Sequence, residues 1–215
     1  MVSGLAAAAA LAVPSAAAAC GASQHHGPVA NNRPGPAPLA VGDSVMLGAV
    51  PELRRAGFEV NARGCRQMSD GVELLASRRR SLPDKVVVAL GYNWTITIEE
   101  IRRALIILGP RRVLGMVTPR GEYSSARAAI HAAGRRWPAR VKVLRWAGRS
   151  RGKVWTWDGL HLTPAGARGF ARLLSNAFEW ELPGAEPKAT EPQPKDPPPE
   201  PRSPQPGDEG GVVAP

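Results

Sequence analysis

The sequence is short of the residues and runs that define several protein classes. It has only two cysteines, which excludes a small fold held together by several disulfides. Beyond residue 30 no apolar run approaches the ~20 residues that a transmembrane helix needs, which excludes a multi-span membrane protein. The length of 215 residues leaves room for one domain of ordinary size with tails.

The charge is basic and unevenly distributed. The chain has only five lysines, so nearly all of its net charge of +10 comes from arginine. Residues 183–215 hold 11 of the 22 prolines and a net charge of −3, so residues 1–182 carry +13. This balance suits nucleic acid, an anionic membrane or an anionic polymer as a partner. A GC-rich genome produces the same composition, so the charge alone selects no partner.

Residues 1–19 are rich in alanine, uncharged, and lead into Cys20. They resemble a secretory signal, or a lipoprotein signal with Cys20 as the attachment site. The segment lacks the Lys or Arg that usually opens a signal. This leaves a misassigned start, the last membrane helix of a longer protein, or a soluble Ala-rich helix as alternatives. We assign residues 1–20 to a signal or membrane anchor.

The segments on either side of the central region are polar and rich in proline. We expect residues 21–37 to form a disordered linker, in which His25 and His26 are solvated rather than metal-binding. Residues 183–215 are too polar to bury a core, which predicts a disordered tail. The folded domain is therefore expected over residues 38–182.

Within that domain, short apolar runs alternate with amphipathic stretches. Five runs are typical of buried strands: residues 39–41, 58–62, 86–90, 113–117 and 141–144. Strands that alternate with helices predict a parallel sheet covered on both faces, which is a three-layer α/β/α sandwich. Functional sites of such sheets lie at the carboxyl ends of the strands.

Two of the helices between the strands carry end signals. Thr97 and Glu100 form a capping box for a helix that Gly109 stops, and Thr163-Pro164 opens the last helix.

Two polar residues lie directly after predicted strands. Ser44, in Gly42-Asp43-Ser44, follows the first strand and opens a helix, where backbone N–H groups favour developing negative charge. Asn93 follows the third strand, where its amide can donate to an oxyanion. Taken singly, these motifs are also compatible with a helix N-cap and an ordinary turn.

A third motif, Asp158-Gly159-Leu160-His161, precedes the last helix. This spacing lets the Asp158 carboxylate reach a ring nitrogen of His161, as the orienting partner of a general base does. A surface turn that ends in a helix-start histidine is the structural alternative.

Together these motifs resemble the SGNH (GDSL-type) hydrolase superfamily, in which a serine, an asparagine and Asp-x-x-His follow one another in this order. The resemblance is strongest to SGNH domains fused to bacterial membrane acyltransferases that O-acetylate cell-envelope glycans. It covers residues 39–174 and rests on four stretches: LAVGDSVMLGAV, VNARGCRQMSDG, VVVALGYN and WDGLHLTPAGA. It implies a flavodoxin-like fold with a five-stranded parallel sheet.

The resemblance also implies roles for individual residues. Ser44 matches the nucleophile, His161 the general base and Asp158 its orienting partner, while Asn93 matches the oxyanion-hole asparagine. A glycine N–H should complete that hole from residues 62–66, where Gly64 is the only glycine. Cys65 beside it is expected to be a small filler.

The chain departs from these relatives at two places. It has Tyr92-Asn93-Trp94 where the relatives usually have Thr-Asn-Gly, and Arg145-Trp146 where they often have Asp-Trp. Tyr92 and Trp94 are candidate contacts for a sugar ring, with core packing as the alternative.

These observations predict an exported serine esterase or O-acyltransferase that acts on acyl, chiefly acetyl, esters of a cell-envelope glycan. A broad small-ester or lipid esterase and a non-catalytic cell-wall binding remnant are the alternatives. We expect no metal or organic cofactor, a monomer, and a membrane acyltransferase as a candidate partner. Nucleic acid is not an expected partner, because export removes the protein from it.

Overall fold

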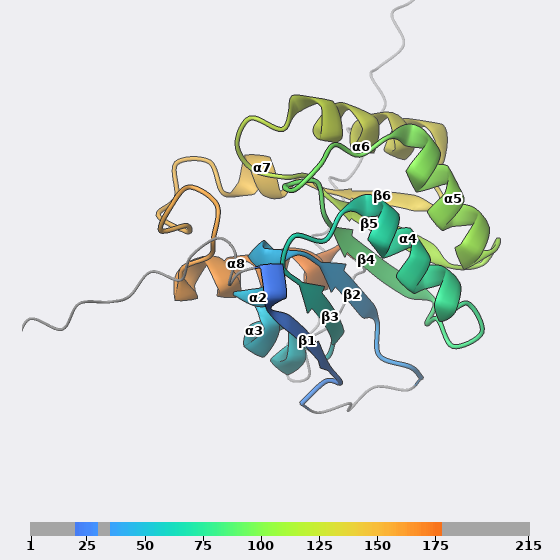
Figure 1. Ribbon diagram of the computed structural model, residues 1–215, viewed down its shortest axis with the longest axis horizontal. Helices are drawn as coiled ribbons and strands as arrows, with labels where there is room; N and C mark the ends of the chain where they lie inside the picture. The colour runs from blue at the N-terminus through green and yellow to red at the C-terminus, as the bar shows by residue number, and fades with distance from the viewer. Residues whose placement is uncertain (1–19, 30–34, 178–215) are drawn as a thin grey trace, which may run out of the picture. The chain divides into compact units, whose positions relative to one another are not determined.

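The fold is described from a computed structural model, which describes residues 20–29 and 35–177. The strands are β1 (Ser23–His26), β2 (Leu39–Gly42), β3 (Glu59–Arg63), β4 (Lys85–Ala89), β5 (Val113–Val117) and β6 (Val141–Leu144). The helices are α2 (Ser44–Leu47), α3 (Val50–Arg55), α4 (Met68–Ser77), α5 (Ile98–Leu108), α6 (Ser124–Arg136), α7 (Trp146–Arg149) and α8 (Pro164–Asn176). Figure 1 shows their arrangement.

The strands form one sheet in the order β1-β3-β2-β4-β5-β6. From β3 to β6 every neighbouring pair is parallel, and these five strands begin and end within one residue of the predicted runs. The predicted five-stranded parallel sheet is therefore confirmed, with an extra strand at one edge. From β2 the chain first adds β3 on one side and then crosses to add β4, β5 and β6 on the other. Doubly wound sheets bind ligands at such a switch point, which here lies between β2 and β4.

Helices cover both faces of the sheet (Figure 1), which confirms the α/β/α sandwich. One core lies between the sheet and the group of α2, α3 and α8, and includes Phe58 and Phe170. The other lies between the sheet and the group of α4, α5 and α6, and includes Leu90 and Ile101. Because side chains alternate along a strand, β2 supplies Ala40 to the first core and Leu39 and Val41 to the second.

The capping signals act as the sequence predicts. Thr97 accepts from the N–H of Glu100, whose carboxylate accepts from the N–H of Thr97, and α5 ends at Gly109 with φ +70°. Thr163 caps α8 by accepting from the N–H of Gly166, with Pro164 in the first turn.

The predicted disordered linker is wrong for Ser23–His26. These residues form β1, which pairs antiparallel with β3 from Ser23↔Arg63 to His26↔Val60. The His25 ring lies 2.8 Å from the Glu59 carboxylate, so it has a partner as well as solvent contact. The prediction failed because this strand has no apolar residue and depends on the backbone of its neighbour.

The predicted signal or anchor over residues 1–20, apart from Cys20, and the predicted tail over 183–215 lie outside the described residues. Within the described ranges, no helix combines the length and apolar character needed to cross a bilayer.

Gly166, in the first turn of α8, packs closely against the backbone of the loop before that helix. A Cβ on Gly166 would lie 1.9 Å from the backbone oxygen of Trp155, and that oxygen also accepts from the N–H of Thr163. We expect Gly166→Ala to lower the free energy of unfolding by roughly 1–3 kcal/mol, despite the better helix propensity of alanine, because a backbone atom cannot rotate away. Urea denaturation measures this.

The matched control is Gly48→Ala, where the nearest atom to the new Cβ is 3.5 Å away. It should change stability by less than about 1 kcal/mol. A Gly166→Ala protein as stable as the wild type would contradict the close contact between this loop and α8.

Candidate active site

Ser44 is held at the carboxyl end of β2 by the cap of a short helix. Asp43 is the N-cap of α2, and its Oδ1 accepts from the N–H of Val45 at 3.0 Å. Ser44 is then the first residue of α2, at the strand-order reversal between β2 and β4. The N-cap alternative from the sequence thus applies to Asp43 and leaves the Ser44 hydroxyl for another partner.

That partner is His161, from the turn before α8. Its Nε2 lies 3.2 Å from Ser44 Oγ, and its Nδ1 lies 2.6 Å from Asp158 Oδ2. The other oxygen of Asp158 accepts from the N–H groups of Leu160 and His161. The structure therefore joins the three predicted residues in one hydrogen-bonded chain from hydroxyl to imidazole to carboxylate.

The surroundings of Asp158 keep it ionised. Burial alone would raise the pKa of this carboxyl, but hydrogen bonds from the His161 ring and from the N–H groups of His161 and Leu160 outweigh it and lower the pKa. A carboxylate in this place fixes the imidazole tautomer and stabilises the imidazolium form.

Asn93 lies beside this chain and is held by two acceptors. Its Nδ2 donates to Asp43 Oδ2 at 3.4 Å and to the Arg66 carbonyl at 3.3 Å. Arg66 is 5% exposed and donates in turn to the carbonyls of Gly42 and Asn61 and to the Asn61 side chain. This buried network aligns the amide of Asn93 with the loop that carries Ser44.

Asp43 is the carboxyl at the centre of that network. It is fully buried, and burial raises its pKa to about 7, against the opposing effects of backbone N–H donors and of the Arg66 guanidinium. A carboxyl that stays largely protonated below pH 7 avoids placing a full negative charge beside the nucleophile. The sequence suggested only a capping role for this residue.

The predicted role of Gly64 in the oxyanion hole stays a prediction, and one observation counts against it. The N–H of Gly64 donates to the Ala22 carbonyl at 2.8 Å, so a substrate would have to replace that bond. The left-handed conformation in this loop belongs instead to Cys65, with φ +56°, the only non-glycine residue with positive φ in the described ranges. Such strain is concentrated at functional sites, which makes the Cys65 N–H the better candidate donor.

Cys65 is not a small filler, because it forms a disulfide with Cys20. The bond joins the segment just before β1 to the loop between β3 and α4, beside the Gly64–Ala22 hydrogen bond. One sulfur cannot carry both a disulfide and a lipid thioether, so this disulfide and a lipid at Cys20 exclude each other.

Tyr92 and Trp94, the two predicted sugar contacts, differ in how far they are buried. Tyr92 packs against the core and edge-on to Tyr123, and its hydroxyl accepts from the N–H of Arg120 at 2.8 Å, which favours the packing alternative. Trp94 is 68% exposed and keeps an open ring face. The structure adds Trp157, 57% exposed, which stacks on the His161 ring with centroids 5.4 Å apart.

Comparison with known proteins gives similarity to bacterial O-acetyltransferases. No protein-family model matches the sequence. The peptidoglycan O-acetyltransferase OatA of Listeria monocytogenes is 31% identical over 151 residues, which are 64% of this chain and 23% of that protein. The folded part of this chain is similar to the SGNH domains that are fused to bacterial O-acyltransferases.

The SGNH domain also has a solved structural neighbour. The C-terminal catalytic domain of Streptococcus pneumoniae OatA superposes with a TM-score of 0.55 at 22% identity, over 67% of this chain and 93% of that one. This likeness supports the fold. The chain itself spans about a quarter of the length of the Listeria relative.

Sequence reasoning about the SGNH domain missed Asp43, Cys65 and Trp157 as parts of the site. Asp43 and Cys65 lie within the motif stretches, but their contacts join segments that are far apart in the sequence. Only Trp157 carried a local signal, since it lies next to Asp158 and four residues before His161.

The Cys20–Cys65 disulfide is expected to stabilise the folded protein. Cys20→Ser opens a link between residues 45 apart, and we expect it to lower the free energy of unfolding by about 2–4 kcal/mol. Urea denaturation with and without dithiothreitol measures this. The wild type should lose the same amount in reductant, whereas the variant should not respond to it. A wild type that unfolds identically in both conditions would argue against the bond.

The second prediction concerns the buried Asp43. Its pKa is raised on folding, so the native state binds an extra proton and stability falls as pH rises from about 4 to about 7. Asp43→Asn keeps the cap but does not titrate. The difference in unfolding free energy between the two proteins should therefore shift in favour of the variant by up to roughly 4 kcal/mol across that window. Parallel stability curves at pH 4, 5.5 and 7 would contradict the raised pKa.

Proposed function

We propose that this SGNH domain is an exported O-acyltransferase that transfers acetyl groups to hydroxyls of a cell-envelope glycan through a serine acyl-enzyme. The observation that carries the proposal is the hydrogen-bonded chain Ser44–His161–Asp158 at the reversal of the strand order. The likeness to two peptidoglycan O-acetyltransferases supports the acetyl group and the glycan acceptor.

The first half-reaction follows from the geometry. Ser44 Oγ attacks the carbonyl carbon of the acetyl donor while His161 Nε2, 3.2 Å away, takes the hydroxyl proton. Asp158 stabilises the imidazolium through the 2.6 Å contact at Nδ1, and the Trp157 ring faces the same imidazole. The proton then passes to the leaving group, and the acetyl group remains on Ser44.

The developing oxyanion needs preorganised donors. The Asn93 amide is the proposed first donor: one of its two N–H groups exchanges its long contact with Asp43 (3.4 Å) or with the Arg66 carbonyl (3.3 Å) for the oxyanion. The N–H groups of Ser44, in the first turn of α2, and of Cys65, in its left-handed turn, are the proposed others. Each well-placed donor contributes roughly 3–4 kcal/mol to such a transition state.

In the second half-reaction His161 deprotonates the incoming hydroxyl. A sugar hydroxyl gives transfer, and water gives hydrolysis. Hydrolysis is the second candidate activity, because Asp158 and its surrounding turn are open to solvent. The exposed Trp94 provides a flat apolar face on which a sugar ring can compete with water.

The cellular setting is also a proposal. Disulfides persist in oxidising compartments outside the cytoplasm, so the Cys20–Cys65 bond supports export. The +13 charge of residues 1–182 suits an anionic envelope. A membrane acyltransferase that delivers the acetyl donor is the proposed partner, because the sequence resembles SGNH domains that are fused to such enzymes.

The direct test is Ser44→Ala in the hydrolysis of 4-nitrophenyl acetate. We expect kcat/KM to fall on the order of 10³-fold or more, because the nucleophile is lost while the fold is retained. The control is Ser69→Ala, an exposed serine of α4, which should leave kcat/KM unchanged. Mass spectrometry of the wild type after a fluorophosphonate probe should place the label on Ser44.

Transfer is then distinguished from hydrolysis by adding a glycan oligosaccharide to the same reaction. Acetylated oligosaccharide formed at the expense of free acetate supports the transferase. Free acetate alone, with the oligosaccharide unchanged, supports the esterase. Full activity of Ser44→Ala would overturn both.

A further inference from the structure

A basic pocket lies at the carboxyl ends of β5 and β6. Its volume is about 490 Å³, and its lining brings together cationic side chains from the turn after β5, from α6, and from the segments on either side of α7. These are Arg120, Arg127, His131, Arg145 and Arg151.

Two of the arginines are fixed in place by neutral acceptors. Arg127 Nη1 donates to the carbonyls of Pro119 and Gly121 at 3.1 and 2.5 Å. Arg120 Nη1 donates to Thr156 Oγ1 at 2.9 Å. These bonds hold the guanidinium groups without neutralising them, which preorganises their charge before a ligand arrives.

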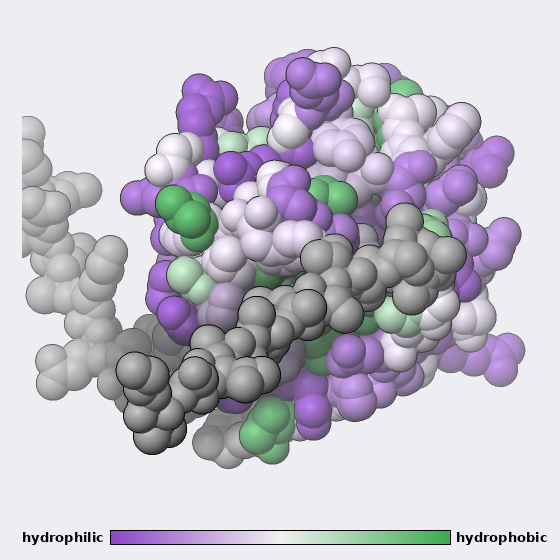
Figure 2. All heavy atoms as spheres, turned by 60° about the vertical axis from the view of Figure 1, so that its left-hand side comes forward, coloured by the Kyte–Doolittle hydropathy of each residue, from purple (hydrophilic) through white to green (hydrophobic). Residues whose placement is uncertain are grey.

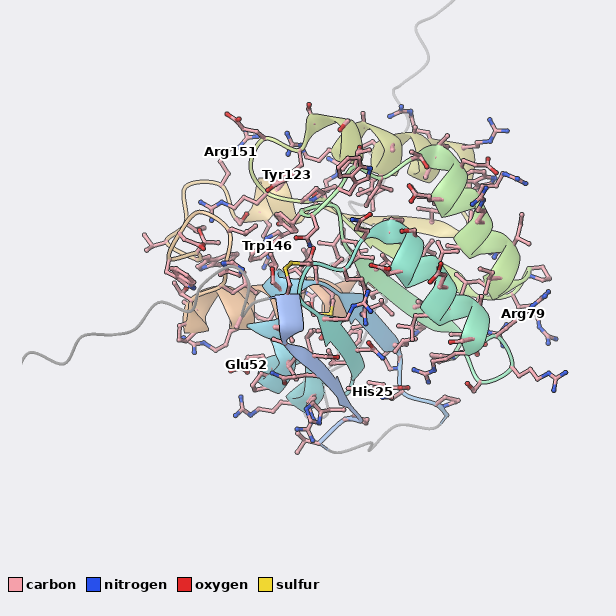
Figure 3. All side chains as sticks on the ribbon, in the orientation of Figure 1. His25, Glu52, Arg79, Tyr123, Trp146 and Arg151 are labelled. Atoms are coloured by element: carbon pink, nitrogen blue, oxygen red, sulfur yellow. A yellow bond between two sulfur atoms is a disulfide. The ribbon has the colours of Figure 1, made fainter. Side chains whose placement is uncertain are left out.

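The arginines of the pocket take part in none of the ion pairs found within residues 20–29 and 35–177. Arg145 and Arg151 are exposed, and Arg151 extends outward near α7 in Figure 3. Burial, together with Arg145, Arg135 and Arg127, lowers the pKa of His131, so the arginines supply the charge at neutral pH.

Two hydrogen bonds of Arg120 connect the pocket to the segments that carry the candidate active site. Arg120 bonds through its side chain to Thr156, two residues before Asp158. Its backbone N–H donates to the hydroxyl of Tyr92, the neighbour of Asn93. Figure 2 turns this side of the molecule forward, and outside the grey atoms its surface is largely hydrophilic with isolated apolar residues. A polar ligand suits such a surface.

We propose that this pocket is a subsite for an oxyanion, a carboxylate or a phosphate, carried by the substrate glycan at a distance from the reacting ester. Arginine forks bind both groups through paired hydrogen bonds, and Arg145 and Arg151 have donors to offer. The proposal rests on the proposed function and specifies its substrate class. The subsite would select charged envelope glycans over neutral sugars with the same acetyl ester.

The test uses Arg145→Gln/Arg151→Gln and three acetylated saccharides. One bears a free carboxylate, one has that carboxylate as a neutral amide, and one bears a phosphate instead. Each kcat/KM is divided by that for 4-nitrophenyl acetate, so that any general loss of activity cancels. The wild type should prefer a charged saccharide over the amide by about 10-fold or more, and the double variant should lose most of this preference.

The matched control is Arg79→Gln/Arg80→Gln, which removes the same charge from the turn after α4. Figure 3 shows Arg79 on the opposite side of the molecule from Arg151. This control should keep the wild-type preference. A preference for phosphate over carboxylate would identify the oxyanion as phosphate. Equal turnover of charged and neutral saccharides by the wild type, or equal loss in both double variants, would overturn the subsite.

Calorimetric titration with citrate separates this proposal from the proposed function. Citrate should bind the wild type and the Arg79/Arg80 control alike, and at least about 10-fold more weakly to the Arg145/Arg151 variant. If the wild type does not hydrolyse 4-nitrophenyl acetate, the proposed function fails while this titration still decides the pocket. Identical citrate affinity in all three proteins would refute the pocket as an anion site.

Discussion

The parallel pairing of β2 with β4 is the constraint on which the site depends. It places Gly42 opposite Ala89, so the chain leaves both strands at the same edge of the sheet. Ser44 and Asn93 follow these ends directly, and β3, on the other side of β2, brings Arg66 to the same place. Asp158 and His161 come instead from the turn before α8, and their position depends on how α8 and that turn pack. The tight fit between Gly166 and Trp155 fixes that turn.

This arrangement of the site requires a buried carboxyl, that of Asp43, which destabilises the fold. Asp43 caps α2, accepts from Asn93 and lies in the field of Arg66, and no apolar residue could perform all three tasks. Burial of a polar group destabilises a fold unless hydrogen bonds compensate. Here they do so only in part, which is why the carboxyl holds its proton to about pH 7. The site thus gains order around its nucleophile at the expense of stability in neutral solution.

The sequence predicted the features that depend on local patterns. The apolar runs gave the five parallel strands, and capping residues marked the helices at Thr97 and Thr163. The motifs after β2 and β4 predicted that Ser44 and Asn93 lie together, because parallel strands share an edge, and the resemblance to SGNH domains added Asp158 and His161. What the sequence did not predict depends on long-range contacts. β1 has no hydrophobic pattern, and Gly64 was chosen as the only glycine in its window, although the left-handed turn belongs to Cys65.

Because β1 pairs with β3, the folded domain begins before residue 38, where the sequence pattern predicted its start. The strand β1 covers the backbone of β3, which would otherwise be an exposed sheet edge, and unpaired edges of this kind promote aggregation. The residues just before β1 supply the Ala22 carbonyl and the Cys20 sulfur that hold the loop of Gly64 and Cys65. A version of the protein shortened to Pro38, where the hydrophobic pattern starts, would keep every residue of the Ser44–His161–Asp158 chain. It would nevertheless lose the strand that seals its edge and anchors one wall of the oxyanion site.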